Sequence, residues 1–127
     1  MKQELLAELL ERLSSFCVHE QLLKELVALV SKGGITPRFL PLFYRRLNQL
    51  EEFGVQAPEK HAEFERLDRD LYSMHISSRD FNIRVLYAFL PDQTVLLLAF
   101  YERGGKSNTD YTRYIPAARR RLEELED

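Results

Sequence analysis

Cationic and imidazole side chains recur on the extended, apolar segments in the second half of the chain. Arg84 stands within the run 81–90, where a cation is costly unless its head group reaches solvent, an anion or a partner. His75 precedes that run, and Arg103 follows the next one. Arginine binds a phosphate and disperses the charge of its transition state, while histidine moves protons near neutral pH. Together these residue types suit the cleavage of a phosphodiester.

Three extended segments must position these side chains. Residues 71–76, 81–90 and 93–101 are rich in branched and aromatic residues, and Pro91-Asp92 forms a turn between the second and the third. We therefore predict a three-stranded antiparallel meander. Its last strand is almost continuously apolar, which is typical of a strand covered on both faces.

Alternation along the strands predicts which side chains share a face. His75 is expected to lie across from Asn82 or Arg84 on the adjacent strand. If the strand order follows the chain, His75, Arg84 and Arg103 converge on one face. The alternative is that Arg84 only pairs with Asp80 or Glu102 and that His75 is an ordinary rim residue.

Helices are expected on both sides of the meander. Apolar residues recur at helical spacing over 2–32, ahead of Gly33-Gly34, and again over 41–53. The polar stretch 55–70 is expected to connect them to the sheet, and 102–110 to form a loop before a final helix that begins near Ile115. The fold class is therefore α+β: N-terminal helices, a three-stranded antiparallel meander and a C-terminal helix.

Length and composition set the frame for this fold. With 127 residues and 45% hydrophobic residues, the chain is expected to form one domain, 1–127, with 1–34 as an additional N-terminal helical segment. The formal net charge is −2, yet residues 71–122 hold eight basic and four acidic side chains. A basic patch for nucleic acid is compatible with this distribution, and so is a solvated charged face without a partner.

The sequence lacks the motifs of disulfide, metal and nucleotide-phosphate sites and of membrane spans. The chain has one cysteine, Cys17, which excludes an intrachain disulfide and fits a reducing compartment. His and Cys spacings typical of metal sites and a Walker A sequence are both missing, so we expect neither a metal nor another cofactor. No apolar run approaches the length of about 20 residues that crosses a bilayer, so we expect no membrane partner.

A set of motifs in the second half carries a family resemblance. They are, in chain order, Phe64-x-x-Leu67, the strand segments Leu71–Ile76, Ile83–Tyr87 and Val95–Phe100, the loop with Arg103 and Lys106, and the helix Ile115–Leu122. Taken together, this stretch resembles the RelE/HigB-type toxins of bacterial toxin–antitoxin systems, in particular their phage-derived HigB-like branch. The resemblance implies a curved antiparallel sheet packed against helices.

The resemblance also implies an activity and partners. Such toxins are metal-independent, cytoplasmic endoribonucleases that cut mRNA, usually on the ribosome, by attack of an RNA 2′-hydroxyl on its adjacent phosphate. Their partner is a cognate antitoxin, in this branch usually a small helix-turn-helix protein. The chain is thus expected to be the toxin of a type II system, with mRNA and the ribosome as further partners.

Site residues follow from the resemblance position by position. Arg84 matches the strand arginine that binds the scissile phosphate, and Arg103 matches the basic residue after the third strand. His75 stands where relatives often have Arg or Lys, so it acts as acid or base or binds phosphate. The late aromatic corresponds to Tyr111 or Tyr114. The catalytic set is expected to be Arg84, Arg103, His75 and Tyr111, and the RNA-binding set Lys106, Arg79, Arg113 and Tyr114.

A second interpretation comes from the departures from the family pattern. Glu102 stands beside Arg103 where two adjacent basic residues are common, and the first β-strand is replaced by helical sequence. A non-catalytic interaction module that keeps the fold and binds an antitoxin-like or regulatory partner would tolerate both changes. A phage structural or regulatory domain is the third interpretation, supported only by the lack of strong motifs.

Overall fold

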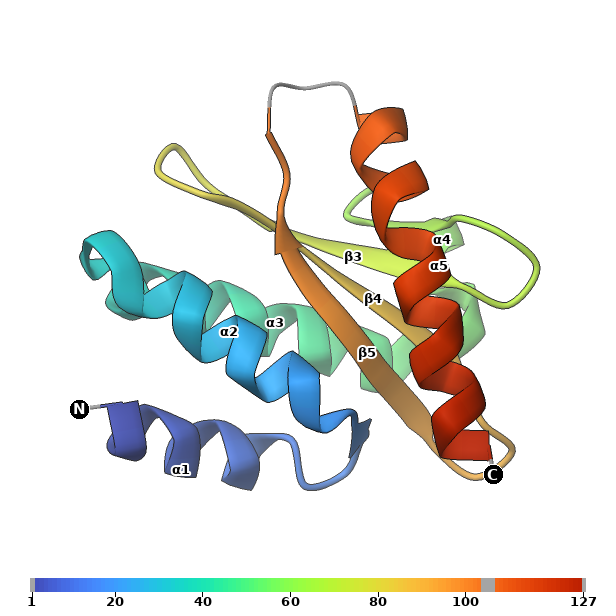
Figure 1. Cartoon of the computed structure of the whole chain (residues 1–127), viewed down its shortest axis with the longest axis horizontal. Coiled ribbons are helices and arrows are strands. Elements are labelled where there is room, and N and C mark those ends of the chain that lie inside the picture. Colours follow the sequence, from blue (N-terminus) through green and yellow to red (C-terminus); the bar gives the residue numbers. More distant parts are fainter. Residues whose placement is uncertain (1, 104–106, 127) are drawn as a thin grey trace.

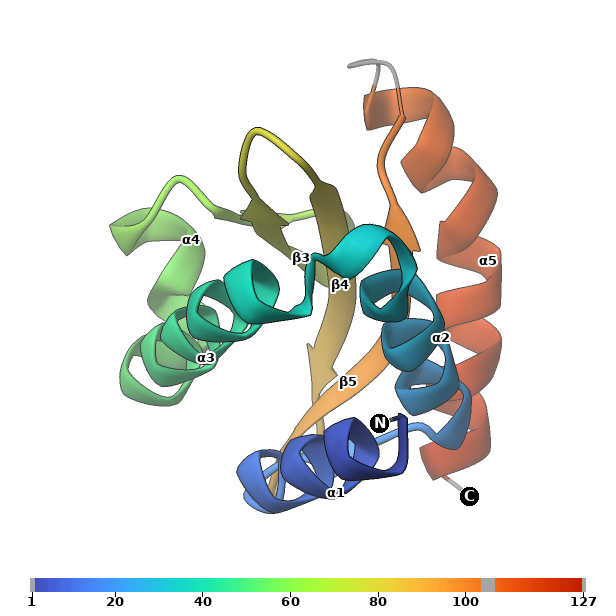
Figure 2. The same ribbon diagram turned by 90° about the vertical axis from the view of Figure 1, so that its left-hand side faces the viewer.

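The computed structural model describes residues 2–103 and 107–126. It contains a five-stranded sheet with the order β1-β5-β4-β3-β2. Helices α1, α2 and α3 pack on one face of the sheet, and α5 lies on the other; in Figure 2, β4 and β5 stand between α3 and α5. No helix among the described residues combines the length and the apolar character that a bilayer crossing requires. The longer helices are α1 (Lys2–Arg12), α2 (Glu20–Ser31), α3 (Thr36–Phe53) and α5 (Ser107–Glu126).

The central part of the sheet is the predicted meander. Strand β3 pairs antiparallel with β4, and β4 pairs antiparallel with β5, with a register shift between Leu86 and Tyr87 (Figure 1). Two further strands extend it: β1 runs parallel to β5 and β2 runs antiparallel to β3. The sheet is therefore mixed and five-stranded rather than a three-stranded meander alone. The strands are β1 (Cys17–Val18), β2 (Phe64–Arg66), β3 (Tyr72–Ser77), β4 (Asn82–Phe89) and β5 (Thr94–Tyr101).

Short elements flank α3 and occupy part of the segment 55–70, which was predicted as a connector. The 3-10 turns η1 (Lys32–Gly34) and η2 (Gly54–Gln56) flank α3, and α4 (Ala57–Lys60) precedes β2. Gly33 and Gly34 have φ angles of 62° and 65°, a left-handed backbone that residues with a Cβ avoid. The double glycine thus ends α2 as its sequence indicates.

Two helices begin earlier than the sequence predicts. Helix α3 begins at Thr36 and includes Pro41, and α5 begins at Ser107 and includes Pro116. A proline inside a helix loses one backbone hydrogen bond, at a cost of about 3 kcal/mol. Burial of Phe39 on α3, and of Tyr111 on α5, anchors the turns that precede each proline. Packing against the sheet therefore outweighs the lost bond.

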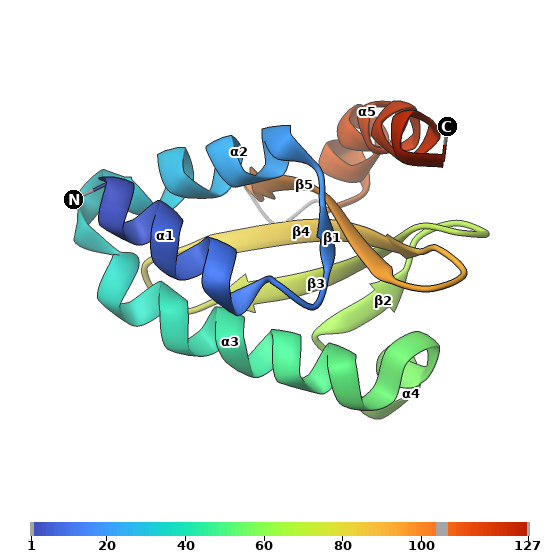
Figure 3. The same cartoon turned by 90° about the horizontal axis from the view of Figure 1, so that it is seen from below.

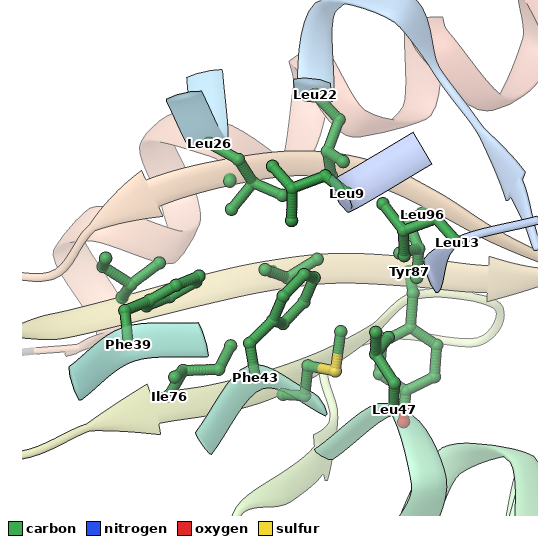
Figure 4. Packing of buried hydrophobic residues seen from close by; sticks show 14 of the residues in the cluster. Leu9, Leu13, Leu22, Leu26, Phe39, Phe43, Leu47, Ile76, Tyr87 and Leu96 are labelled. Atoms are coloured by element: carbon green, nitrogen blue, oxygen red, sulfur yellow. The ribbon is translucent and has the colours of Figure 1, made fainter. Parts of the chain in front are cut away.

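Apolar side chains form one cluster on each face of the sheet. The cluster beneath α1–α3 is built around aromatic rings of α3, with Phe39 and Phe43 stacked at 5.3 Å between ring centroids. Figure 4 shows leucines of α1 and α2 above these rings, on the same side of the sheet. The second cluster joins β4 and β5 to α5 through Leu86, Phe100 and Ala118.

Tyr87 carries a hydroxyl that the core does not satisfy. Its side chain is completely buried, and its Oη has no hydrogen-bond partner among the described residues. Burial also raises the pKa of this hydroxyl, which therefore stays protonated. A buried polar group without a partner costs about 1–3 kcal/mol.

The change Tyr87→Phe is expected to raise the free energy of unfolding by about 1 kcal/mol, because it removes only that hydroxyl. The ring contacts, such as the stack on Tyr72 at 5.3 Å, would remain. Urea denaturation measures the effect, and Tyr101→Phe at an exposed position is the control, with no gain expected. A loss of stability in Tyr87→Phe would show that the hydroxyl has a stabilising partner.

Candidate active site

His75 and Arg84 lie directly opposite each other on adjacent strands. They are register partners in the antiparallel pair of β3 and β4. The residues that flank them in sequence, such as Met74 and Val85, belong to the cluster beneath α1–α3. Because side chains alternate along a strand, His75 and Arg84 project toward the face on which α5 lies. The predicted convergence of these two side chains is thus present.

Tyr111 of α5 joins this pair from above the sheet. Its hydroxyl lies 3.2 Å from Nε2 of His75 and 2.9 Å from Oγ of Ser73, which is the next residue of β3 on the same face. Tyr111 is buried, and its ring meets Phe100 edge-to-face at 5.8 Å. Of the two candidate tyrosines, Tyr111 is therefore the one that contacts the histidine.

Two carboxylates that were not predicted as catalytic residues complete the surroundings. Oε1 of Glu65, on β2, lies 3.1 Å from Nε2 of His75. Oε2 of Glu102 lies 3.8 Å from Nε of Arg84, and the Glu102 side chain is 1% exposed. The alternative pairing of Arg84 with Glu102 is thus present, whereas Asp80 pairs with Arg38 at 2.8 Å. We refer to His75, Arg84 and Tyr111 with these two carboxylates as the strand cluster.

The environment of the strand cluster keeps its groups in defined protonation states. Burial, and then the positive charge of Arg84, lower the pKa of His75 below its ordinary value of 6.5, although the hydrogen bond that the imidazole donates to Glu65 acts in the opposite direction. Burial raises the pKa of Tyr111. At neutral pH the imidazole is therefore an uncharged base and the phenol a hydrogen-bond donor.

This histidine makes stability depend on pH in a predictable direction. Because the folded protein binds the His75 proton less tightly than the unfolded chain, acidification through pH 6.5 is expected to lower the free energy of unfolding. Above that pH the histidine is neutral in both the folded and the unfolded state, so it no longer makes the free energy of unfolding depend on pH. In His75→Gln the decrease between pH 7.5 and 5.5 should be smaller, as measured by urea denaturation at each pH. An identical decrease would show that His75 titrates normally.

Arg46 supports the strand cluster from the opposite side of the sheet. This arginine of α3 is buried, and its Nε donates a 2.9 Å hydrogen bond to the carbonyl oxygen of His75. The backbone N–H of His75 in turn donates to the carbonyl oxygen of Glu63, whose carboxylate lies 3.8 Å from Nη2 of Arg46. The backbone of β3 is thereby fixed at the residue that carries the imidazole.

The remaining predicted residues lie elsewhere. Arg103, Arg113 and Tyr114 line a groove between α2 and α5, which no residue of the strand cluster lines. This groove does not bring Arg103 to His75 and Arg84, and their convergence on one hollow stays a prediction. Arg103 follows the end of β5, where strand alternation no longer dictates the side-chain direction. Arg79 is exposed in the turn between β3 and β4, and Lys106 lies outside the described residues.

The described residues contain no set of side chains that could ligate a metal ion. Among residues 2–103 and 107–126, no three His, Cys, Asp or Glu side chains are grouped so that they could hold a metal ion. The strand cluster instead offers a neutral imidazole, a guanidinium, a phenol and two carboxylates. Such groups can bind a phosphodiester and move a proton at one of its oxygens.

Comparison with known proteins places the chain in a family. The comparison with curated proteins gives no match, and the comparison with solved structures gives none either. Residues 40–123, most of the chain and all of the strand cluster, match the model of the phage-derived Gp49-like proteins (DUF891). The chain therefore belongs to the phage-derived Gp49-like family, a RelE/toxin-like family.

Proposed function

We propose that the protein is the toxin of a type II toxin–antitoxin system, a metal-independent endoribonuclease that cuts ribosome-bound mRNA. The observation that carries this proposal is the convergence of His75, Arg84 and Tyr111 on one face of the sheet, with Tyr111 Oη 3.2 Å from His75 Nε2. Membership of a RelE/toxin-like family supports it. The cognate antitoxin is proposed to be a helix-turn-helix protein.

In this proposal each side chain of the strand cluster has a role. Glu65 beside Nε2 holds the imidazole proton on that nitrogen, which leaves Nδ1 of the neutral ring as the proton acceptor. His75 then takes the proton of the RNA 2′-hydroxyl as its oxygen attacks the adjacent phosphorus. Arg84 neutralises the charge that develops on the phosphate, and Tyr111 donates a hydrogen bond to it.

The bonds that form and break in this step determine the products. The bond between the 2′-oxygen and phosphorus forms as the bond to the 5′-oxygen breaks, and the 5′-oxygen takes up a proton from water. His75 returns its proton to solvent. Cleavage therefore leaves a 2′,3′-cyclic phosphate and a 5′-hydroxyl, and it requires neither water as nucleophile nor a metal.

The experiment is induction of the protein in bacteria, together with incubation of the purified protein with mRNA-programmed ribosomes. We expect translation arrest and cut mRNA with a 5′-hydroxyl end, and relief of the arrest when a neighbouring gene for a small helix-turn-helix protein is co-expressed. His75→Gln should abolish cleavage, because glutamine cannot accept the proton. Normal growth on induction together with intact mRNA would contradict the proposal.

A second candidate function is a non-catalytic interaction module. Glu102 favours it, because a buried carboxylate 3.8 Å from Nε of Arg84 offsets the charge that would bind a phosphate. This candidate predicts that induction is harmless, while the protein still co-purifies with the product of a neighbouring gene. The same induction experiment therefore separates the two.

A further inference from the structure

Ser73 is a buried polar residue that has no part in the proposed chemical step. It lies on β3 and is completely buried, and its side chain points toward the face on which α5 lies, as that of His75 does. Its register partners are Leu86 on β4 and Glu65 on β2, the strand at the edge of the sheet next to β3 (Figure 3). A polar group that is cut off from water destabilises the fold unless a hydrogen bond satisfies it, so the partner of this hydroxyl indicates its role.

The hydroxyl of Ser73 has one hydrogen-bond partner in the part of the chain that the structure describes. Its Oγ lies 2.9 Å from Oη of Tyr111, and either oxygen could be the donor in this contact. If Tyr111 donated, the proton of Ser73 would be left without an acceptor in a position that water does not reach. Ser73 therefore donates the hydrogen bond, and Tyr111 accepts it.

This hydrogen bond determines where the proton of Tyr111 can go. Oη of Tyr111 also lies 3.2 Å from Nε2 of His75, but that nitrogen holds its own proton toward Oε1 of Glu65, 3.1 Å away, and so cannot accept another. Ser73 and His75 are thereby excluded as acceptors. In the free protein the phenol proton is left to the carboxylate of Glu65, which is a further hydrogen-bond partner of Tyr111.

The ionisation of Tyr111 supports this order of donors and acceptors. Burial raises the pKa of the phenol, the hydrogen bond with Ser73 lowers it, and the hydrogen bond to Glu65 raises it. A donor to the phenol oxygen stabilises the phenolate, whereas an acceptor of the phenol proton stabilises the neutral form. The ring itself is held in place, because Tyr111 is buried and meets Phe100 edge-to-face at 5.8 Å.

We propose that Ser73 is a positioning residue, which donates to Oη of Tyr111 and so directs the phenol proton toward the phosphate of bound RNA. The inference rests on the proposed function for the identity of this phosphate. An anion at Arg84 competes with Glu65 for the proton of Tyr111, and it meets a phenol that Ser73 has already oriented. Because Ser73 is completely buried, it does not itself touch the RNA.

A double-mutant cycle on cleavage tests whether Ser73 acts through Tyr111. Ser73→Ala is expected to lower kcat for cleavage of mRNA on ribosomes about 5-fold, which corresponds to one hydrogen bond of ordinary strength, and to leave KM unchanged. In Tyr111→Phe, which has no phenol proton to direct, adding Ser73→Ala should not lower kcat further. The matched control is Ser77→Ala, at an exposed position of the same strand, with the wild-type kcat expected.

The direction of the hydrogen bond is measured on the same variants without RNA. The infrared C–O stretch of Tyr111, isolated as the difference between spectra of the protein with and without Tyr111→Phe, changes frequency when the phenol oxygen stops accepting a hydrogen bond. We expect this change in Ser73→Ala and an unchanged frequency in Ser77→Ala. Together with a cycle in which Ser73→Ala has no effect on kcat once Tyr111 is replaced, it supports the inference.

Failure of the inference and failure of the proposed function give different results. A wild-type protein that cuts no RNA overturns the proposed function, while the frequency change in Ser73→Ala still supports donation by Ser73 to Tyr111. An unchanged frequency in Ser73→Ala overturns the inference, even if the wild-type protein cuts RNA. So does an equal loss of kcat on adding Ser73→Ala to Tyr111→Phe, because Ser73 would then act independently of the phenol.

Discussion

Replacing Arg84 by alanine is expected to lower the rate of RNA cleavage by about 10²- to 10³-fold, the usual cost of removing one group that stabilises a charged transition state. The guanidinium stands beside His75 on the adjacent strand, so a phosphate within reach of the imidazole is also within reach of Arg84. Single-turnover cleavage of mRNA on ribosomes measures the loss. Arg84→Lys keeps the charge but not the planar fork, and an intermediate rate is expected.

Two measurements separate chemistry from folding in these variants. Arg120→Ala, on the exposed face of α5, should cleave at the wild-type rate. Thermal unfolding must be followed in parallel, because Arg84→Ala removes a positive charge that lies 3.8 Å from the buried carboxylate of Glu102. Wild-type cleavage by a folded Arg84→Ala variant would exclude the strand cluster as the active site.

The three strands of the meander were predictable because their sequences are long enough to show a pattern. Strands β3, β4 and β5 have six to eight residues each, with apolar character that ends at polar turns. Strands of two and three residues, as in β1 and β2, contain no period that could be recognised. They form because β3 and β5 offer pairing positions at the edges of the meander.

The strand cluster was predictable only where strand alternation determines direction. Alternation predicted that His75 lies across from Asn82 or Arg84, since these residues belong to regular strands, and the register pairs it with Arg84. Glu65 belongs to a polar segment that gives no sign of a strand, so its position next to His75 could not be deduced. Arg103 lies beyond the end of β5, and its location in the groove depends on how α2 and α5 pack.

Arg46 shows a further limit of periodicity. A charged residue on an amphipathic helix is interpreted as solvent-facing, yet Arg46 is 8% exposed. Besides Gln49 on the same helix, Arg46 contacts the carbonyl of His75 and the carboxylate of Glu63, which come from segments far away in sequence. Local sequence carries no information on such partners, because burial of the charge depends on hydrogen bonds that only the complete fold supplies.

The largest effect on stability is expected from Phe43→Ala in α3. Phe43 is completely buried between the helices and the sheet, where Figure 4 shows it between Ile76 and Tyr87. Truncation removes the ring and leaves a cavity, and the helices can close it only in part. We expect the free energy of unfolding to fall by about 3–5 kcal/mol in urea denaturation.

Two controls show whether the loss of stability in Phe43→Ala comes from the core cavity: a truncated exposed leucine, and the cleavage activity of the folded variant. Leu10→Ala on α1, at a position that is 51% exposed, should change the free energy of unfolding by less than about 0.5 kcal/mol. Phe43 lies on the face opposite to the strand cluster, so the folded Phe43→Ala variant should cut RNA at the wild-type rate at a temperature where it remains folded. A loss of stability below about 1 kcal/mol would mean that the helices re-pack over the sheet, since only collapse of the cavity could restore the lost contacts.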